Sequence, residues 1–385
     1  MTAKLVKPRF RLRLTWLVLG LMLALILAAC GDNTNTAVPA TTATATTAAP
    51  VATTVASTTL AATTAAATTV APGTTAATTA AATTAAVTTA PATTAAPTTA
   101  PVTTVAAPAT KIKVLATTTQ LGDFARNIGG DRVEVTQILR PDDDPHDYDP
   151  TADDSKNAAA AQLVLKNGVG LDDWLDKIIT NSGTKAPLID TSEGIKLRAG
   201  DGSDEEKEGD PHIWHSTDNA KIMVANIAKG LAQVDPAGSD YYQAQLTAYQ
   251  KQLDDLKTQI TQVFTPVPVE KRKLVTNHDA FGYFTDEFQI TIVGSVIPSF
   301  SDAAQPTPQE INELIKNIKD NNVKVIFTET TINPKIAEQV AQTAGVQIYS
   351  NLYGDALGPA GSDGDTYLKM ELSNAKNMAA GFQQQ

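Results

Sequence analysis

Two of the four histidines in this sequence close the same tripeptide, Asp-Pro-His, at 144–146 and at 210–212. A third, His278, lies in the segment 275–284. Neutral imidazole nitrogens are among the ligands that zinc and related divalent cations of intermediate softness prefer. Three imidazoles held on separate loops would supply most of a metal site. Any one of these histidines taken alone is better explained as a residue of a surface loop.

Proline chemistry explains why the two tripeptides should present their histidines from stiff loops. The segment 140–150 contains three prolines and five aspartates, a composition that excludes a helix interior or a central strand. Within each tripeptide, proline fixes its own φ and restricts the residue before it. The second tripeptide begins at the last residue of the acidic segment 199–210. We expect this segment to be solvated surface or, alternatively, a rim that weakly attracts cations.

The region 111–385 alternates between strand and helix patterns, which predicts parallel sheets with helices on both faces. A strong helix start is expected at Thr307, followed by proline and, three residues on, by Glu310 of a capping box. The predicted strands are 112–117, 133–138, 163–165, 188–190, 273–276, 290–293, 323–327 and 346–349.

The most periodic segment predicts one long helix. Its apolar residues step by four and three, and the segment is bounded by Pro236 and Pro266. These residues are Tyr242, Leu246, Tyr249, Leu253, Leu256, Ile260 and Val263. A coiled coil is an alternative, but the flanking α/β units favour a connector. We therefore expect an α/β protein with lobes at 111–236 and 266–385, joined by a helix over 237–265.

The predicted strands place the candidate ligands at one cleft. Ligands of open α/β sheets bind outside the carboxyl ends of the strands. His146, His278 and Asp355 all follow such ends, and His212 lies between elements of the first lobe. A cleft between the lobes would then receive two imidazoles from the first lobe, and one imidazole and one carboxylate from the second.

Residues 1–29 have the pattern of an export signal. Five basic residues precede an apolar run over 14–29 that is broken only by Thr15 and Gly20, and the run is short for a membrane span. It ends in Leu-Ala-Ala-Cys at 27–30, which resembles a bacterial lipobox and implies cleavage before Cys30 and attachment of a diacylglyceryl group. Two acyl chains make a stable anchor, so we expect a lipoprotein on the extracytoplasmic face of the cell membrane.

Composition changes abruptly after Cys30, to Ala, Thr, Pro and Val with Asp32 as the only charge before residue 111. Such a run cannot bury a core, so residues 30–110 are expected to be a lipidated, disordered tether. The signal takes five of the 30 basic residues and the tether one of the 41 acidic ones, leaving 25 against 40. A net charge of about −15 argues against nucleic acid as a partner and suits a domain that attracts cations.

The chain from about residue 113 to 382 resembles the TroA-like solute-binding lipoproteins of zinc and manganese ABC importers. The resemblance implies a C-clamp of two (β/α) lobes joined by a rigid helix, with the metal buried between them and a membrane permease as partner. Four ligand positions of the family fall on His146, His212, His278 and Asp355. The matching stretches, in the family's order, are 144–150, Asn167-Gly168 with Leu171 and Trp174, 210–214, 278–284, 327–329 with 333–335, 352–358 and 364–367.

Three imidazoles and one carboxylate suit tetrahedral Zn²⁺ better than Mn²⁺, which prefers oxygen-rich coordination. Relatives that favour manganese or iron usually carry Glu where this chain has His278. Asp355 could bind through both oxygens and accept a larger ion, which leaves Mn²⁺ or Fe²⁺ as the alternative. Two departures are an acidic segment where zinc-specific relatives often have a His-rich loop, and His215 at a usually apolar position. We expect His215 to be an outer-surface or supporting residue, not a fifth ligand.

A binding protein without enzymatic activity is thus the favoured hypothesis. No G-x-x-x-x-G-K-[ST] motif occurs, so ATP hydrolysis would belong to a separate ATPase subunit. A zinc hydrolase would need an open coordination position and a base. Asp355 would fill that position, and Glu329, the one candidate base, is better explained as a structural carboxylate at a strand end. A third hypothesis, a surface adhesin in cell adhesion, is suggested only by the long tether.

Overall fold

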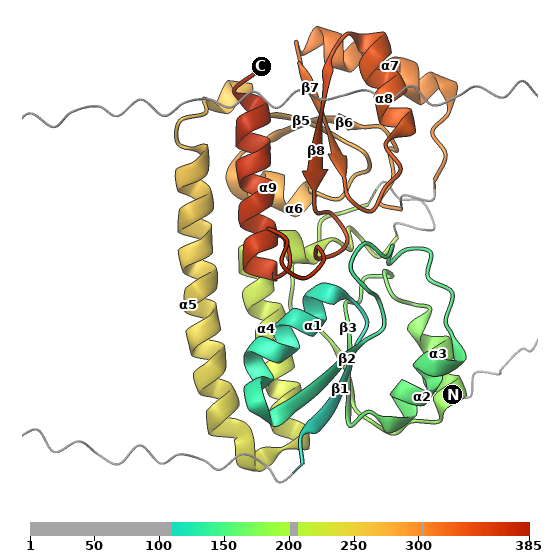
Figure 1. Ribbon diagram of the computed structural model, residues 1–385, viewed down its shortest axis with the longest axis vertical. Helices are drawn as coiled ribbons and strands as arrows, with labels where there is room; N and C mark the ends of the chain where they lie inside the picture. Colours follow the sequence, from blue (N-terminus) through green and yellow to red (C-terminus); the bar gives the residue numbers. More distant parts are fainter. Residues whose placement is uncertain (1–109, 201–206, 302–303) are drawn as a thin grey trace, which may run out of the picture. The chain divides into compact units, whose positions relative to one another are not determined.

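A computed structural model of the protein describes residues 110–200, 207–301 and 304–385 (Figure 1). The expected signal segment, Cys30, the tether up to residue 109 and residues 201–206 of the acidic segment lie outside the described residues. Within the described part, two α/β lobes are joined by one long helix, α5 (Ser239–Phe264). The predicted fold class is therefore confirmed.

A four-stranded parallel sheet in the order β2-β1-β3-β4 forms the centre of the first lobe. Its strands are β1 (Ile112–Ala116), β2 (Val133–Gln137), β3 (Leu163–Lys166) and β4 (Leu188–Asp190). Its helices are α1 (Thr119–Gly129), α2 (Ala152–Ala160), α3 (Leu175–Ser182) and α4 (Thr217–Val234). Because the strands are parallel, the loops that follow them all leave the same edge of the sheet.

Successive residues of the central strands point into two different cores. Val114 and Ala116 of β1 belong to the cluster that includes residues of α1, α4 and α5, whereas Leu115 belongs to the cluster under α2 and α3. In β3, Val164 joins the second cluster and both of its neighbours join the first. Burial on both faces explains why these strands are almost continuously apolar in sequence.

The second lobe consists of two parallel strand pairs that lie side by side (Figure 1). They pair β5 (Lys273–Thr276) with β6 (Thr291–Ser295), and β7 (Val325–Glu329) with β8 (Gln347–Leu352). The helices are α6 (Gly282–Phe288), α7 (Pro308–Asp320), α8 (Lys335–Ala344) and α9 (Tyr367–Phe382). Helix α7 begins with the predicted capping box: Glu310 N donates to Thr307 Oγ1 at 3.3 Å, and Thr307 N donates to Glu310 Oε2 at 2.7 Å.

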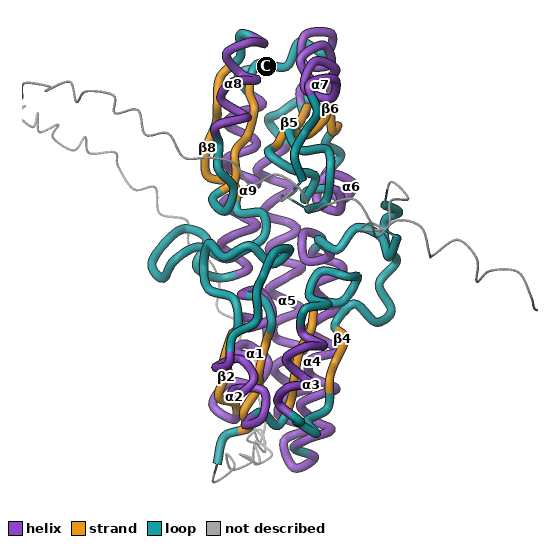
Figure 2. Tube along the Cα trace, turned by 90° about the vertical axis from the view of Figure 1, so that its right-hand side faces the viewer, coloured by secondary structure: helices purple, strands orange, loops and turns teal. Residues whose placement is uncertain are grey.

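Helix α5 runs alongside both lobes (Figure 2) and buries the predicted apolar stripe. The first six predicted residues are buried, but the last position of the stripe is taken by Phe264, while Val263 is only partly buried. Phe264 packs against the aromatic rings of Phe284, Phe288 and Phe382. Aromatic packing in the second lobe thus determines where the stripe ends.

A single large hydrophobic cluster contains side chains from both lobes. At its centre, Phe124 of α1 packs edge-on against Tyr249 of α5 and Tyr367 of α9. The lobes therefore share a core, which holds the loops between them more firmly than a thin linker would.

No helix in the described part of the chain is long and apolar enough to cross a membrane.

Candidate metal centre

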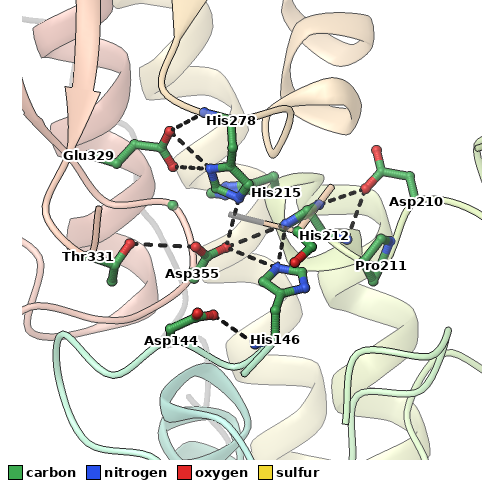
Figure 3. Close-up of polar contacts among 12 residues, drawn as sticks. Asp144, His146, Asp210, Pro211, His212, His215, His278, Glu329, Thr331 and Asp355 are labelled. Carbon is green, nitrogen blue, oxygen red and sulfur yellow. Dashed lines mark hydrogen bonds and ion pairs between the residues drawn. The ribbon is translucent and has the colours of Figure 1, made fainter. Parts of the chain in front are cut away.

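Four side chains converge where the lobes meet (Figure 3). His146 and His212 come from the first lobe, and His278 and Asp355 from the second. One ring nitrogen or carboxylate oxygen of each lies within 4.8 Å of those of the other three. The structure thus brings together the four residues that the sequence singled out; their role as metal ligands stays a prediction.

His146 stands on the loop between β2 and α2, in a turn stabilised by its own tripeptide. Its backbone N–H donates to Asp144 Oδ1 at 2.7 Å. The indole Nε1 of Trp174 donates to the carbonyl oxygen of Pro145 at 2.9 Å and ties this loop to the start of α3. The imidazole is the least enclosed of the four groups, with 8% of its side chain exposed.

His212 lies in the second copy of the same turn and is fully buried. Its backbone N–H donates to Asp210 Oδ1 at 3.0 Å, and its ring Nδ1 lies 2.9 Å from the same oxygen. The repeated Asp-Pro-His sequence therefore encodes a repeated geometry, in which aspartate accepts the backbone N–H two residues on. Only the second aspartate also reaches the ring. Asn167 Nδ2, which donates to Pro211 O at 3.0 Å, fixes this turn on the loop after β3.

His278 follows β5 and is held by the neighbouring strand β7. Its Nδ1 lies 3.0 Å from Oε2 and 3.1 Å from Oε1 of Glu329, the last residue of β7. Glu329 N in turn donates to Asn277 Oδ1 at 3.3 Å. A carboxylate on Nδ1 fixes the orientation of an imidazole and leaves Nε2 to face a cation. Glu329 thus lies at a strand end, as expected from the sequence, and there it contacts the His278 ring.

Asp355 follows β8 of the second lobe, yet its loop is held by the first lobe. Gln120 Nε2 of α1 donates to the carbonyl oxygen of Asp355 at 2.9 Å. On either side of the aspartate, Trp214 Nε1 donates to Gly354 O at 3.1 Å, and Leu357 N donates to Thr119 Oγ1 at 2.8 Å. This loop therefore links the two lobes at the position of the carboxylate.

Four of the six separations between these groups are 3.3–3.9 Å, close to those around a small tetrahedral cation, and all six lie within 4.8 Å. Asp355 Oδ1 lies 3.4 Å from Nε2 of both His212 and His278. Nε2 of His146 lies 3.3 Å from Nε2 of His212 and 3.9 Å from Asp355 Oδ1. A tetrahedron with metal–ligand bonds of about 2.0–2.1 Å has edges of about 3.3–3.4 Å. Among the described residues, His278 Nε2 and Asp355 Oδ1 are buried without a hydrogen-bond partner, which leaves both atoms free to bind a cation.

Electrostatics divide the three imidazoles into two kinds. Burial lowers the pKa of His146 to about 3. Burial would also lower the pKa of His212, but the neighbouring carboxylates of Asp210 and Asp355 outweigh burial and raise the pKa to about 9. Burial is likewise outweighed at His278, where Glu329 and Asp355 raise the pKa well above its ordinary value. Against its burial, the charge of His278 holds the pKa of Asp355 well below its usual range. In the metal-free protein, His212 and His278 thus favour the protonated form, whereas His146 favours the neutral form.

A pocket of about 50 Å³ opens between the lobes beside His146. It is lined by Val169–Leu171 and Pro211 of the first lobe and by Ser299–Ser301 of the second. Among the four convergent side chains, only that of His146 lines this pocket. His146 is therefore the member of the cluster nearest to this opening.

Two expectations about polar residues near the site were wrong in part. His215 does not lie on the outer surface: it is 1% exposed, its Nδ1 lies 2.8 Å from Glu371 Oε1 of α9, and it stacks on Phe281. It is not among the four convergent groups. Asp210 was expected to be solvated with the rest of the acidic segment, but it is fully buried. Its bonds to His212 and to Arg198 Nη1, the latter at 2.9 Å, compensate the burial of its charge.

Sequence reasoning missed the orienting role of Asp210 and gave Arg198 no role at all. The sequence did contain a sign of the role of Asp210, because Asp210 occupies the same place in its Asp-Pro-His tripeptide as Asp144. No comparable signal marks Arg198, which lies in a segment without periodicity.

Comparison with known proteins agrees with this geometry. A family model for ZnuA, the periplasmic component A of the zinc-uptake complex, matches residues 114–381. The manganese ABC transporter substrate-binding lipoprotein PsaA of Streptococcus mitis is 29% identical over 283 residues, covering 72% of this chain and 91% of that protein. The metal ABC transporter substrate-binding lipoprotein FimA of Streptococcus parasanguinis is 29% identical, covering 71% of this chain and 90% of that protein.

Solved structures point the same way. The periplasmic zinc-binding protein TroA of Treponema pallidum matches with a TM-score of 0.66 and 28% identity, covering 71% of this chain and 99% of that chain. A crystal structure of ZnuA matches with a TM-score of 0.62 and 28% identity, covering 70% of this chain and 99% of that chain. Since the family model matches well over half of the sequence, this chain belongs to the ZnuA family, the periplasmic metal-binding components of ABC importers.

Proposed function

We propose that this protein captures Zn²⁺ through Nε2 of His146, His212 and His278 and through the carboxylate of Asp355, and delivers it to an ABC importer. The observation that carries the proposal is the convergence of these four groups, three of them fully enclosed, with their ligand atoms all within 4.8 Å of one another. The carboxylates of Asp210 and Glu329 support it, because each contacts the Nδ1 side of an imidazole whose Nε2 faces the cluster.

Zinc is favoured over manganese by the donor set. Three nitrogens and one oxygen suit tetrahedral Zn²⁺, whereas Mn²⁺ prefers octahedral, oxygen-rich sites. The second candidate is Mn²⁺ or Fe²⁺, which the second oxygen of Asp355 would favour. The Oδ2 atom lies 3.5 Å from Thr331 Oγ1, which is long for a hydrogen bond. This weak contact leaves the carboxylate able to turn its second oxygen towards a larger cation. The relative PsaA is named for manganese and the neighbour TroA for zinc, so names alone do not decide.

The same proposal includes partners and location. A membrane permease would receive the ion, and a separate ATPase subunit would drive transport, because this sequence has no P-loop motif.

A diacylglyceryl group on Cys30 would anchor the chain to the extracytoplasmic face of the cell membrane. Relatives named as lipoproteins support this anchoring. Substituting Cys30→Ala should move the protein from the membrane fraction to the soluble fraction; unchanged membrane association would contradict the anchor.

Capture explains the site better than hydrolysis does. A catalytic zinc keeps one position open for water and needs a base nearby. Here Asp355 supplies a fourth protein ligand, and Glu329 is engaged with Nδ1 of His278, on the other side of the ring from the cluster.

Metal competition tests the proposal directly. The mature chain, stripped of metal, is titrated with Zn²⁺ and with Mn²⁺ against a chelator of known affinity, and bound metal is counted by mass spectrometry. We expect one ion per chain and tighter binding of zinc. Sub-stoichiometric binding would contradict the proposed function, and tighter binding of manganese would contradict the choice of metal.

A further inference from the structure

Arg198 lies outside the candidate metal centre but contacts both lobes near two of its histidines. It belongs to the segment between β4 and α4, and 29% of its side chain is exposed. Its guanidinium donates from Nη1 to Asp210 Oδ2 and from Nε to Asp286 Oδ2, both at 2.9 Å. One carboxylate belongs to the first lobe and the other to α6 of the second lobe, so a single side chain bridges the lobes.

On the side of the first lobe, Arg198 acts on the support of His212. Asp210 uses Oδ1 for the backbone N–H and ring of His212, and Oδ2 for Arg198. The two residues are also joined through the backbone, because Asp210 N donates to Arg198 O at 3.0 Å. The orientation of the Asp210 carboxylate is therefore fixed from both ends.

On the side of the second lobe, Arg198 contacts the helix that begins four residues after His278. Arg198 N donates to Tyr283 Oη at 3.0 Å, and this hydroxyl donates to Asp210 O at 2.9 Å. The guanidinium carbon lies 5.8 Å from the centre of the Tyr283 ring, within the range of a cation–π contact. A Cβ on Gly282 would overlap Arg198 Nη1, so the glycine allows this close approach.

We propose that Arg198 is a positioning residue that holds the His212 turn against α6 and thereby sets how long a captured metal ion stays bound. This inference rests on the proposed function. The physical reason is that an ion held by two ligands from each lobe leaves faster when the ligands of one lobe can shift relative to those of the other, and Arg198 bonds to both sides. Outer residues that orient metal ligands typically change affinity by about 10- to 100-fold when removed.

The test measures metal release from the mature full-length chain loaded with Zn²⁺, by stopped-flow transfer to an excess of chelator. For Arg198→Ala we expect about tenfold faster dissociation, the lower end of that range because the arginine acts through Asp210. The association rate should stay within about twofold of wild type, since the four ligands are unchanged. Arg198→Lys, which keeps the charge but loses the two-pronged geometry, should restore part of the lifetime.

Arg132 offers a matched control in the same lobe. It pairs with Asp235 at 2.7 Å and lies 5.8 Å from the Tyr242 ring, so its chemistry matches that of Arg198. It is separated from the His212 turn by the length of α4, roughly 27 Å for 18 residues. Arg132→Ala should lower the melting temperature without changing metal release. Equal acceleration in both variants would overturn the inference, because general destabilisation would then explain it.

Two further readouts keep the inference testable if Arg198→Ala folds poorly. Asp286→Asn removes only the outer contact and should accelerate release by a smaller factor in the same direction. Co²⁺ in place of zinc should show altered visible absorption bands in the Arg198 variants and unaltered bands in Arg132→Ala. Wild-type release rates in all Arg198 and Asp286 variants would overturn the inference while leaving the proposed function intact. Failure of wild-type protein to bind metal would contradict both.

Discussion

The three convergent imidazoles differ in burial and in the contacts that orient their rings: His212 and His278 are alike, and His146 differs. His212 and His278 are fully enclosed, and each has a carboxylate on Nδ1. His146 has its backbone fixed by Asp144 but no carboxylate on its Nδ1 among the described residues, and it borders the pocket between the lobes. His212 and His278 are thus buried and each is oriented by a carboxylate, whereas His146 lies between them and the solvent-facing pocket.

The largest expected effect separates these two kinds of ligand. His212→Ala or His278→Ala should lower zinc affinity by more than the 100-fold that marks the upper range for outer residues. His146→Ala should cost less, because water from the pocket can take its place, as in zinc sites with three protein ligands and one water. Competition titration of the three variants measures this order. Equal losses for all three would contradict the division.

The second effect concerns the carboxylates behind the rings. Asp210→Asn and Glu329→Gln should each weaken zinc binding by about 10- to 100-fold, because the imidazole loses both its orientation and its charged partner. Asp144→Asn provides the control, since within the described part of the chain Asp144 accepts the backbone N–H of His146 and does not contact its ring. We expect the control to stay close to wild type in the same titration. A loss as large as that of Asp210→Asn would show that turn geometry, not ring support, matters.

The positions of the convergent side chains were largely predictable from the sequence, but the carboxylates that contact the imidazole rings were not. The positions of His278 and Asp355 followed from strands ending just before them, since period and β-branched residues identify a buried strand locally. Glu329 acts on a residue 51 positions away, and a pairing of that range depends on how β5 and β7 lie together. Phe264 replaced Val263 for a similar reason: a stripe with steps of three and four fits both, and packing against Phe382 selects one.

A third effect is the pH dependence of binding. In the metal-free protein, the pKa of His212 is raised from 6.5 to about 9, so the folded state holds a proton there at neutral pH. The stability given by this proton is fully present below pH 6.5 and is lost as the pH rises through about 9. Metal must displace the proton, so zinc affinity should rise about tenfold per pH unit in that window for each proton released.

Calorimetry in buffers of different ionisation enthalpy counts the released protons. We expect at least one proton at pH 7.5, from His212 or His278, and none from His146, whose pKa is lowered to about 3. The metal-induced rise in melting temperature should also grow with pH across the same window. A count of zero, or an affinity independent of pH, would contradict the electrostatic difference between the imidazoles.

The smallest expected effect is on the choice of metal. His278→Glu exchanges a nitrogen ligand for oxygens and should narrow the preference for zinc over manganese, because Mn²⁺ favours oxygen ligands. Glu329 would then face a second carboxylate, so His278→Gln, which adds no charge, serves as the control. An unchanged ratio of zinc to manganese affinity in His278→Glu would argue against a selective role for this position.

The position of the bound ion would show whether these four side chains form one metal site. Crystals of the zinc-loaded mature chain, measured on both sides of the zinc absorption edge, would place the metal by its anomalous signal. We expect one ion about 2.0–2.2 Å from Nε2 of His146, His212 and His278 and from a carboxylate oxygen of Asp355. An ion bound elsewhere, or bound by no more than two of these four residues, would contradict this expectation.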